Sequence, residues 1–421
     1  MWNTADISLL RSGPSQAVYR WIFQLSFLII YGISKCCHFF KLRYNRQTHR
    51  VEETQYHKII SKLIVTAKCC LFLRHIFDYI VFFFVIWIHV FIVQNSDGQD
   101  FIISLAMEAI AFNVLRRILM FLHCQDDRGI LKQLVNEIIY ITRTIQKKFG
   151  LIYHCEISLL GVYLCKVYMT YVLLESLWYK PYFLWPNFLY WVLLEYCEFG
   201  YFIYQLILIN WYRNFGFFLQ SFIEHHEHEH IISRYYHQRL LWLFKLHLRI
   251  CKLHKSVNKE IAWLPSAIYL GIFTCIFNME LLLECIVYAD NDIEDKVYII
   301  ADGCLGSMLV PLLNVLILGL CTDRLRNEEL TLQQQIVIVN IIYFRKANHH
   351  GYTLKGLHNE YCTSLIVHQK VDPLQNIIIF QINCDREFAF DYLLTVLITA
   401  LSFIQYTVGS NRSLKECVSH K

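Results

Sequence analysis

The chain has 421 residues, of which 56% are apolar and only 17% are charged, whereas charged residues make up about 25% of a typical water-soluble protein. Its 15 Gly and 6 Pro residues leave few breaks for separate soluble domains, and its formal charge of +5 is too small to indicate a nucleic-acid binder. The 16 Cys residues include no Cys-x-x-Cys pair and are interpreted as small apolar residues, not as a disulfide network. A disordered chain and a secreted disulfide scaffold are therefore excluded.

Seven apolar stretches are long enough to cross a membrane as helices. A bilayer core about 30 Å thick requires roughly 20 apolar residues at 1.5 Å per residue, and a helix satisfies its own backbone hydrogen bonds over such a run. An eighth stretch, 17–34, contains Arg20 and precedes a basic segment, which favours an interfacial or re-entrant helix over an eighth span. The predicted spans are 70–94, 101–123, 153–174, 187–211, 262–289, 297–321 and 387–407.

The distribution of Lys and Arg predicts the orientation of these spans. Basic residues are concentrated in segment 35–68 and in the connections after the second, fourth and sixth spans, while the connections 95–100 and 290–295 are short and acidic. Basic connections lie on the cytoplasmic side of membrane proteins. The predicted fold class is an all-α membrane protein with seven transmembrane helices, a cytosolic N-terminus and an extracellular C-terminus. Asn411, in the sequon Asn-Arg-Ser, is then a candidate glycosylation site in the outer tail.

This topology divides the chain into four predicted regions. They are a cytosolic N-terminal region (1–69), the first six spans with a long cytosolic extension at 212–261 (70–320), a cytosolic anchor segment (321–386), and the last span with a short outer tail (387–421). The N-terminus of a G-protein-coupled receptor lies on the opposite side, and the Asp-Arg-Tyr and Asn-Pro-x-x-Tyr motifs of such receptors are missing from the corresponding spans.

Charged residues within the spans are candidates for a ligand site, because one near the bilayer centre costs roughly 2.5–3.5 kcal/mol unless it faces protein or water. Glu108, Glu284 and Asp302 lie toward the outer ends of their spans, where they would favour a cationic or hydroxyl-bearing ligand. Snorkelling to the outer interface is the alternative, and it is equally favoured for Glu284. The full set of acidic candidates is Asp78, Glu108, Glu156, Glu195, Glu198, Glu284 and Asp302.

Aromatic residues are dense at the outer ends of the third and fourth spans. An interfacial belt accounts for most of them, and a cavity wall for a small amphipathic ligand accounts for a few. The predicted ligand pocket consists of Glu108, Tyr168, Tyr171, Trp191 and Asp302.

The segment 224–230 formally contains a His-Glu-x-x-His motif in His226, Glu227 and His230. Two His residues at this spacing on a helix can hold zinc, with the Glu as general base. Here the residues between the ligands are His228 and Glu229, whereas a zinc-protease helix is buried and apolar at these positions. We therefore interpret the segment as a solvated helical extension of the fourth span, with an adventitious or regulatory metal site as the alternative, and we expect no enzyme activity, catalytic metal or cofactor.

The region 371–406 has the most specific pattern in the chain: an apolar helix or strand, an Asn-Cys-Asp-Arg break, and a span that ends in Gln405 and Tyr406. This pattern resembles the C-terminal signature of the insect gustatory receptors, which are relatives of the insect odorant receptors. The signature's Thr-Tyr pair is replaced by Ile398 and Thr399, and Ser402 interrupts its apolar run, while the Gln is kept and Tyr406 replaces Phe. The basic stretch 40–51 and the predicted topology also resemble the family pattern.

The resemblance implies a tastant-gated, nonselective cation channel in the plasma membrane of a sensory neuron, formed by a homo- or heterotetramer of such subunits. The last span would line the pore, with Gln405, Ser402 and Ile398 on its pore-facing side, and the ligand would be a bitter or other small-molecule tastant. The alternatives are a metabotropic receptor, a transporter, whose internal repeats are not evident, and a membrane metalloprotease. No nucleic acid is expected as a partner.

Overall fold

The computed structural model describes the main helices and two short hairpins of the chain. The residues described are 21, 24–32, 42–45, 47–53, 66, 69–70, 73, 77, 80, 130–150, 161–168, 171, 185–226, 234–260, 264, 293–349, 378–379, 382–383, 391, 394–395, 398, 402 and 405.

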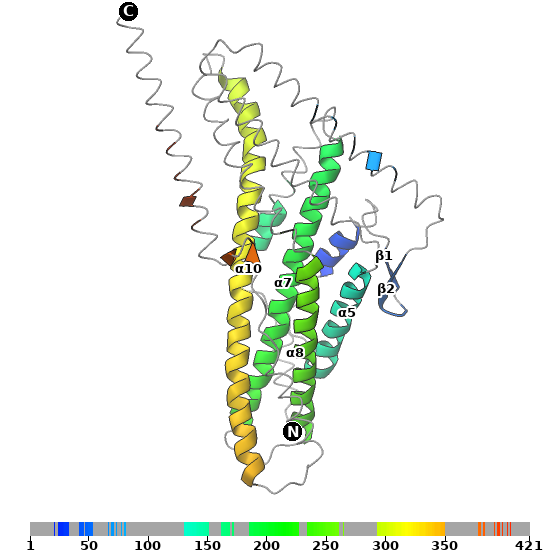
Figure 1. Cartoon of the computed structure of the whole chain (residues 1–421), viewed down its shortest axis with the longest axis vertical. Coiled ribbons are helices and arrows are strands. Elements are labelled where there is room, and N and C mark those ends of the chain that lie inside the picture. The colour runs from blue at the N-terminus through cyan, green and yellow to red at the C-terminus, as the bar shows by residue number, and fades with distance from the viewer. Residues whose placement is uncertain are drawn as a thin grey trace, which may run out of the picture.

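Four long helices form an elongated bundle (Figure 1). They are α5 (Ile130–Phe149), α7 (Trp185–His226), α8 (Arg234–Glu260) and α10 (Ile293–His349). Helix α7 packs along α10 and also contacts α5, and α5 in turn contacts α8. The predicted spans 187–211 and 297–321 lie within α7 and α10 and are helical over their whole length. Within the helices that the structure describes, no segment combines the length and apolar character needed to cross a membrane.

Helix α10 is one continuous helix that includes Pro311. Beyond the predicted sixth span it continues to His349, so the span and part of the anchor segment form one rod. Helix α7 likewise continues past its predicted span to His226, as expected for a helical extension. Of the formal zinc motif, only His226 lies in this helix, and Glu227 and His230 fall outside the described residues.

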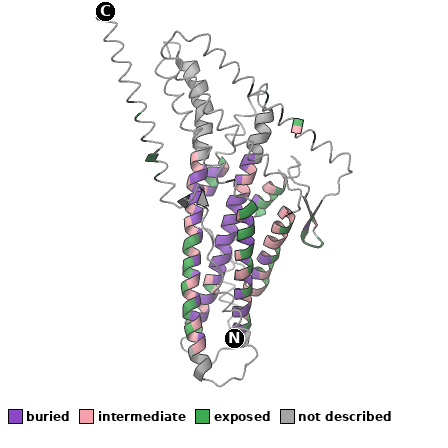
Figure 2. Cartoon of the chain, viewed as in Figure 1, coloured by how far each residue is buried: buried purple, intermediate pink, exposed green. Residues whose placement is uncertain are grey.

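The core of the described bundle lies where α7, α8 and α10 meet, as the buried positions in Figure 2 show. In α10 the buried positions recur at alternating intervals of four and three residues, which is the seam of a coiled-coil-like helix pair. Helix α7 supplies large side chains that are almost fully buried. The α10 seam consists of Leu325, Glu329, Leu332, Ile336, Val339 and Tyr343, and the α7 side chains include Trp211, Tyr212, Phe215, Leu219 and Phe222.

The half-buried thiol of Cys251 lies beside this seam. Burial, together with the nearby Glu329 carboxylate, raises the pKa of Cys251 to about 12. The thiol therefore stays protonated at neutral pH and has little nucleophilic character. Among the described cysteines, Cys321 of α10 is fully buried, whereas Cys70 and Cys165 are exposed.

The prediction of an all-α chain is wrong in two places. Strands β1 (Leu42–Asn45) and β2 (Arg50–Glu53) form an antiparallel hairpin, and strands β3 (Ile378–Ile379) and β4 (Ile382–Asn383) form a second one. The second hairpin decides between the helix and the strand that the sequence left open in region 371–406.

Two local features stabilise the first hairpin. The Asn45 carboxamide oxygen accepts hydrogen bonds from the backbone amides of Gln47 and Thr48, and His49 adopts a positive φ of 53°, so the chain reverses within four residues. The side chain of Asn136 in α5 then hydrogen-bonds both the amide and the carbonyl of Val51, at 2.7 and 2.9 Å. These two hydrogen bonds pair the backbone amide and carbonyl of Val51, which face away from β1 on the outer edge of β2.

Candidate functional site

The described residues of the last predicted span share one exposed helical face. Ile398, Ser402 and Gln405 are helical, all three are exposed, and they follow one another at intervals of four and three residues. The Ser402 hydroxyl donates to the Ile398 carbonyl at 2.8 Å, so its hydrogen is held by the helix backbone. Further positions on this face extend toward the start of the span. They are Asp391, Leu394 and Thr395.

The predicted pocket residues are only partly described. Tyr168 and Tyr171 are 65% and 60% exposed and share a helical face with Leu164, which is 55% exposed. Trp191 and Asp302 lie in α7 and α10, but their side chains are outside the described set. Glu108 and Asn411 also lie outside the described residues. The predicted pocket therefore lies mainly outside the described residues.

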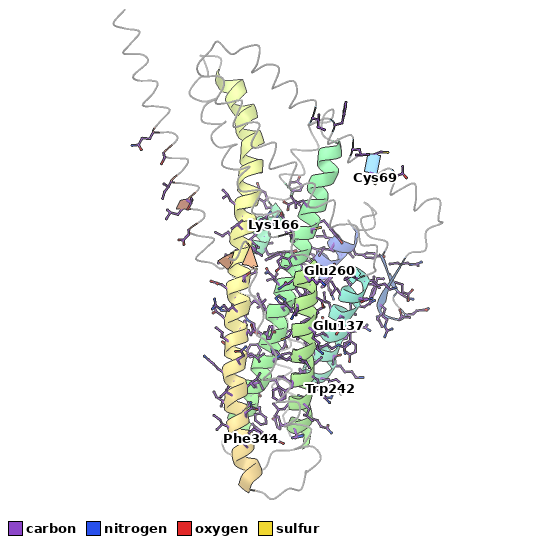
Figure 3. The ribbon with its side chains drawn as sticks, viewed as in Figure 1. Cys69, Glu137, Lys166, Trp242, Glu260 and Phe344 are labelled. Atoms are coloured by element: carbon purple, nitrogen blue, oxygen red, sulfur yellow. The ribbon has the colours of Figure 1, made fainter. Side chains whose placement is uncertain are left out.

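A buried ionic cluster joins three helices: the helix 161–168, α7 and α10. Lys166, in the helix 161–168, places its ammonium 2.5 Å from a carboxylate oxygen of Glu195 and 3.4 Å from one of Glu198, both in α7. The Asn314 amide of α10 donates to the same Glu198 oxygen. All four residues are at most 5% exposed. Figure 3 labels Lys166 beside α7 and α10.

The chemistry of this cluster explains why the groups can be buried. An isolated buried charge is costly, and it is tolerated where opposite charges and hydrogen bonds compensate it. One ammonium between two carboxylates meets this requirement, and the Asn314 amide adds a further donor. The cluster therefore couples the positions of three helices in a geometry that depends on charge.

Two of these four residues are among the candidates predicted from the sequence, and the other two are not. Glu195 and Glu198 were candidates because they are acidic residues within a predicted span. Lys166 was missed, although a Lys near the middle of the predicted third span is the same kind of signal, and Asn314 carries no charge. The three-residue spacing of Glu195 and Glu198 along α7, together with Lys166 on the preceding span, could have indicated the cluster. The participation of α10 through Asn314 could not be predicted from the sequence.

A second buried contact involves the N-terminal apolar stretch. Ser26 is fully buried, and its hydroxyl lies 2.6 Å from the Tyr163 hydroxyl, which is on the same helix as Lys166. Neighbouring residues Phe27 and Leu28 are 47% and 68% exposed. The stretch is thus helical over 24–32 and packs one side against the predicted third span.

The C-terminal halves of α7 and α10 are also joined by an ion pair. The Arg213 guanidinium of α7 lies 2.6 Å from Glu328 of α10, and Arg324 lies 3.0 Å from the same carboxylate. Exposed apolar residues run along the outer side of α10 beyond this pair. Leu330, Val337, Ile338 and Ile341 are between 45% and 62% exposed.

Comparisons with known proteins identify the family. No family model matches the sequence. The chain is 52% identical to Gustatory receptor-like 43a of Drosophila melanogaster over 421 residues, which cover 100% of this chain and 98% of that protein.

Two solved structures share the fold. The olfactory receptor OR5 of the insect Machilis hrabei in complex with eugenol matches with a TM-score of 0.57 at 9% identity, over 91% of this chain and 99% of that chain. A second structure of OR5 matches with a TM-score of 0.52, also at 9% identity, over 93% of this chain and 99% of that chain. The full-length sequence match, with a common fold, shows that the chain belongs to the insect gustatory receptor family.

Proposed function

We propose that the chain is a taste chemoreceptor of the plasma membrane and works as a ligand-gated, nonselective cation channel made of four subunits. The observation that carries this proposal is the exposed helical face formed by Ile398, Ser402 and Gln405. If four copies bring this face together, each contributes one neutral amide to a ring at Gln405. Such a ring can coordinate partly hydrated cations without strong selectivity, while apolar residues below it can close the pore by dewetting.

Exposed apolar residues at helical spacing support the membrane location. Leu73, Phe77 and Ile80, in the first predicted span, are between 58% and 63% exposed. With Leu164 in the third span and Leu394 in the last, they form apolar surfaces of the kind that lipid or another subunit covers. In this arrangement Tyr168 and Tyr171 face the same surroundings as Leu164.

A small-molecule ligand is supported by the relatives. One relative is named a gustatory receptor-like protein, and the OR5 structure contains eugenol. We propose that a bitter or other small tastant binds toward the outer side of the bundle, in the region of Glu108, Trp191 and Asp302. A ligand opens such a channel only to the extent that it binds the open form more tightly than the closed form.

Recording from cells that express the chain tests the proposal against a metabotropic receptor. We expect tastant-evoked cation currents that persist in excised patches without guanine nucleotides, and we expect an N-terminal tag to be labelled only after the cells are permeabilised. A response that requires guanine nucleotides, together with a tag labelled on intact cells, would contradict the channel and its topology.

Subunit assembly can be tested at the exposed apolar face of α10. We expect the double variant Val337→Glu, Ile341→Glu to weaken tetramer formation about tenfold or more, because charges would replace two apolar side chains in a contact between subunits. Size-exclusion chromatography with light scattering measures the assembly. The matched control is Val337→Leu, Ile341→Leu, which keeps the face apolar and should still assemble. Unchanged assembly of the Glu variant would exclude this face from the interface.

A further inference from the structure

A groove of about 540 Å³ lies between α5 and α8, and its lining includes no residue of the ionic cluster or of the described part of the terminal helix. This volume is typical of a site for a small molecule. Apolar side chains form part of its wall, and the remainder is polar and mainly basic. The lining residues are Gln133, Leu134, Glu137, Lys245, Leu248, Arg249, Lys252, Leu253 and Ser256.

The two helices that form the groove have a large net positive charge. They contain eleven Lys and Arg residues against two Glu residues, a net charge of +9, whereas the whole chain has a net charge of +5. The remainder of the chain is therefore slightly acidic. A surface with this excess of one sign attracts ligands of the opposite sign.

Within the groove, three cations follow one line along α8. Lys245, Arg249 and Lys252 are spaced by four and three residues, so they lie on one face and within about 10 Å along the helix. Lys245 and Lys252 are exposed. One small molecule that carries several negative groups can therefore contact all three.

Glu137 holds the central cation of this line. Its carboxylate accepts two hydrogen bonds from the Arg249 guanidinium, one of them at 2.9 Å, and the guanidinium lies 4.0 Å from the centre of the Tyr140 ring. Figure 3 shows Glu137 between α5 and α8. This fork of two N–H donors also matches two oxygens of a phosphate group. A phosphate entering the groove can thus take the place of the carboxylate.

We propose that the groove between α5 and α8 binds a small anion that carries several phosphate groups, such as a phosphorylated inositol. The size of the groove, the line of three cations and the preorganised guanidinium all favour this chemistry over an extended acidic peptide. Such an anion is available as the headgroup of a phospholipid in the cytosolic leaflet or as a free inositol phosphate. Binding would join α5 to α8 and so couple the ligand to the bundle; this role is additional to the proposed channel and does not depend on it.

Binding to the purified full-length chain tests the site. The first probe is inositol hexakisphosphate added to the protein in detergent, and the second is phosphatidylinositol bisphosphate in nanodiscs, with phosphatidylserine of equal total charge as the comparison. We expect Lys245→Gln, Lys252→Gln to weaken binding about thirtyfold, since each base near such a ligand contributes about a factor of five to ten. Circular dichroism and size-exclusion chromatography check that each variant is folded.

Two further variants separate a defined site from general attraction. Lys255→Gln, Lys259→Gln removes the same charge from exposed positions of α8 outside the groove, and its affinity should remain within about threefold of the wild type. Glu137→Gln should bind several times more tightly, because it removes a negative charge and releases Arg249. Equal losses in the two Lys pairs, or weaker binding by Glu137→Gln, would overturn the proposal. If inositol hexakisphosphate binds, the ligand is a free phosphate ester. If phosphatidylinositol bisphosphate binds and the soluble probe does not, the ligand is a membrane lipid.

Discussion

Replacing Lys166 by Met is expected to destabilise the folded chain by about 3–5 kcal/mol. The substitution would leave the Glu195 and Glu198 carboxylates together in a buried position without the ammonium that lies between them. Removing one partner of a buried ion pair has this cost because the remaining charge is not compensated. Thermal unfolding of the purified protein and the amount of receptor at the cell surface would both report the loss.

Two companion variants make this test specific. Leu164→Met, two residues away on the exposed side of the same helix, should leave stability close to that of the wild type. Adding Glu195→Gln to Lys166→Met should restore part of the stability, because one of the two uncompensated carboxylates is then neutral. If Lys166→Met is as stable as Leu164→Met, the cluster does not hold the three helices together.

The second large effect is expected from Gln405→Arg. In a tetramer this substitution places four positive charges around the proposed constriction, so we expect the cation conductance to fall about tenfold or more. The opposite variant, Gln405→Glu, should increase the preference for cations over anions and favour block by divalent cations. Reversal potentials and single-channel currents measure both effects, and surface labelling controls for expression.

This pair of variants tests the pore assignment directly. The two substitutions differ in sign at one exposed helical position, so a general effect on folding would affect both in the same direction. Conductance and permeability that stay the same in both variants would show that Gln405 does not line the ion path. The exposed face would then have to be covered by lipid or by another part of the assembly.

Much of the helical framework could be predicted from hydropathy. The predicted fourth and sixth spans lie within α7 and α10, and α7 continues past its predicted span to His226, the last described residue of segment 224–230. The resemblance based on the end of the last span also led to the correct family. These predictions succeed because long apolar runs and a local motif are properties of contiguous sequence.

Other features could not be read in this way. Helix α5 lies in a polar connection, and its apolar face is visible only as the spacing of Leu134, Ile138, Ile141 and Ile145. The first hairpin depends on Asn136, which is 85 residues away from the strand residue that it caps. Helix α5 is stabilised by packing against α7 and α8, and the first hairpin by the side chain of Asn136. Both sets of partners are distant in sequence.

The sequence by itself determined that this chain is rich in long apolar stretches, and its terminal motif indicated the receptor family. Only the tertiary structure decided that Lys166, Glu195, Glu198 and Asn314 meet in one buried cluster and that α5 and α8 enclose a basic groove. The physical reason is that hydropathy and helical periodicity act along the chain, whereas charge compensation and groove formation depend on which helices pack together.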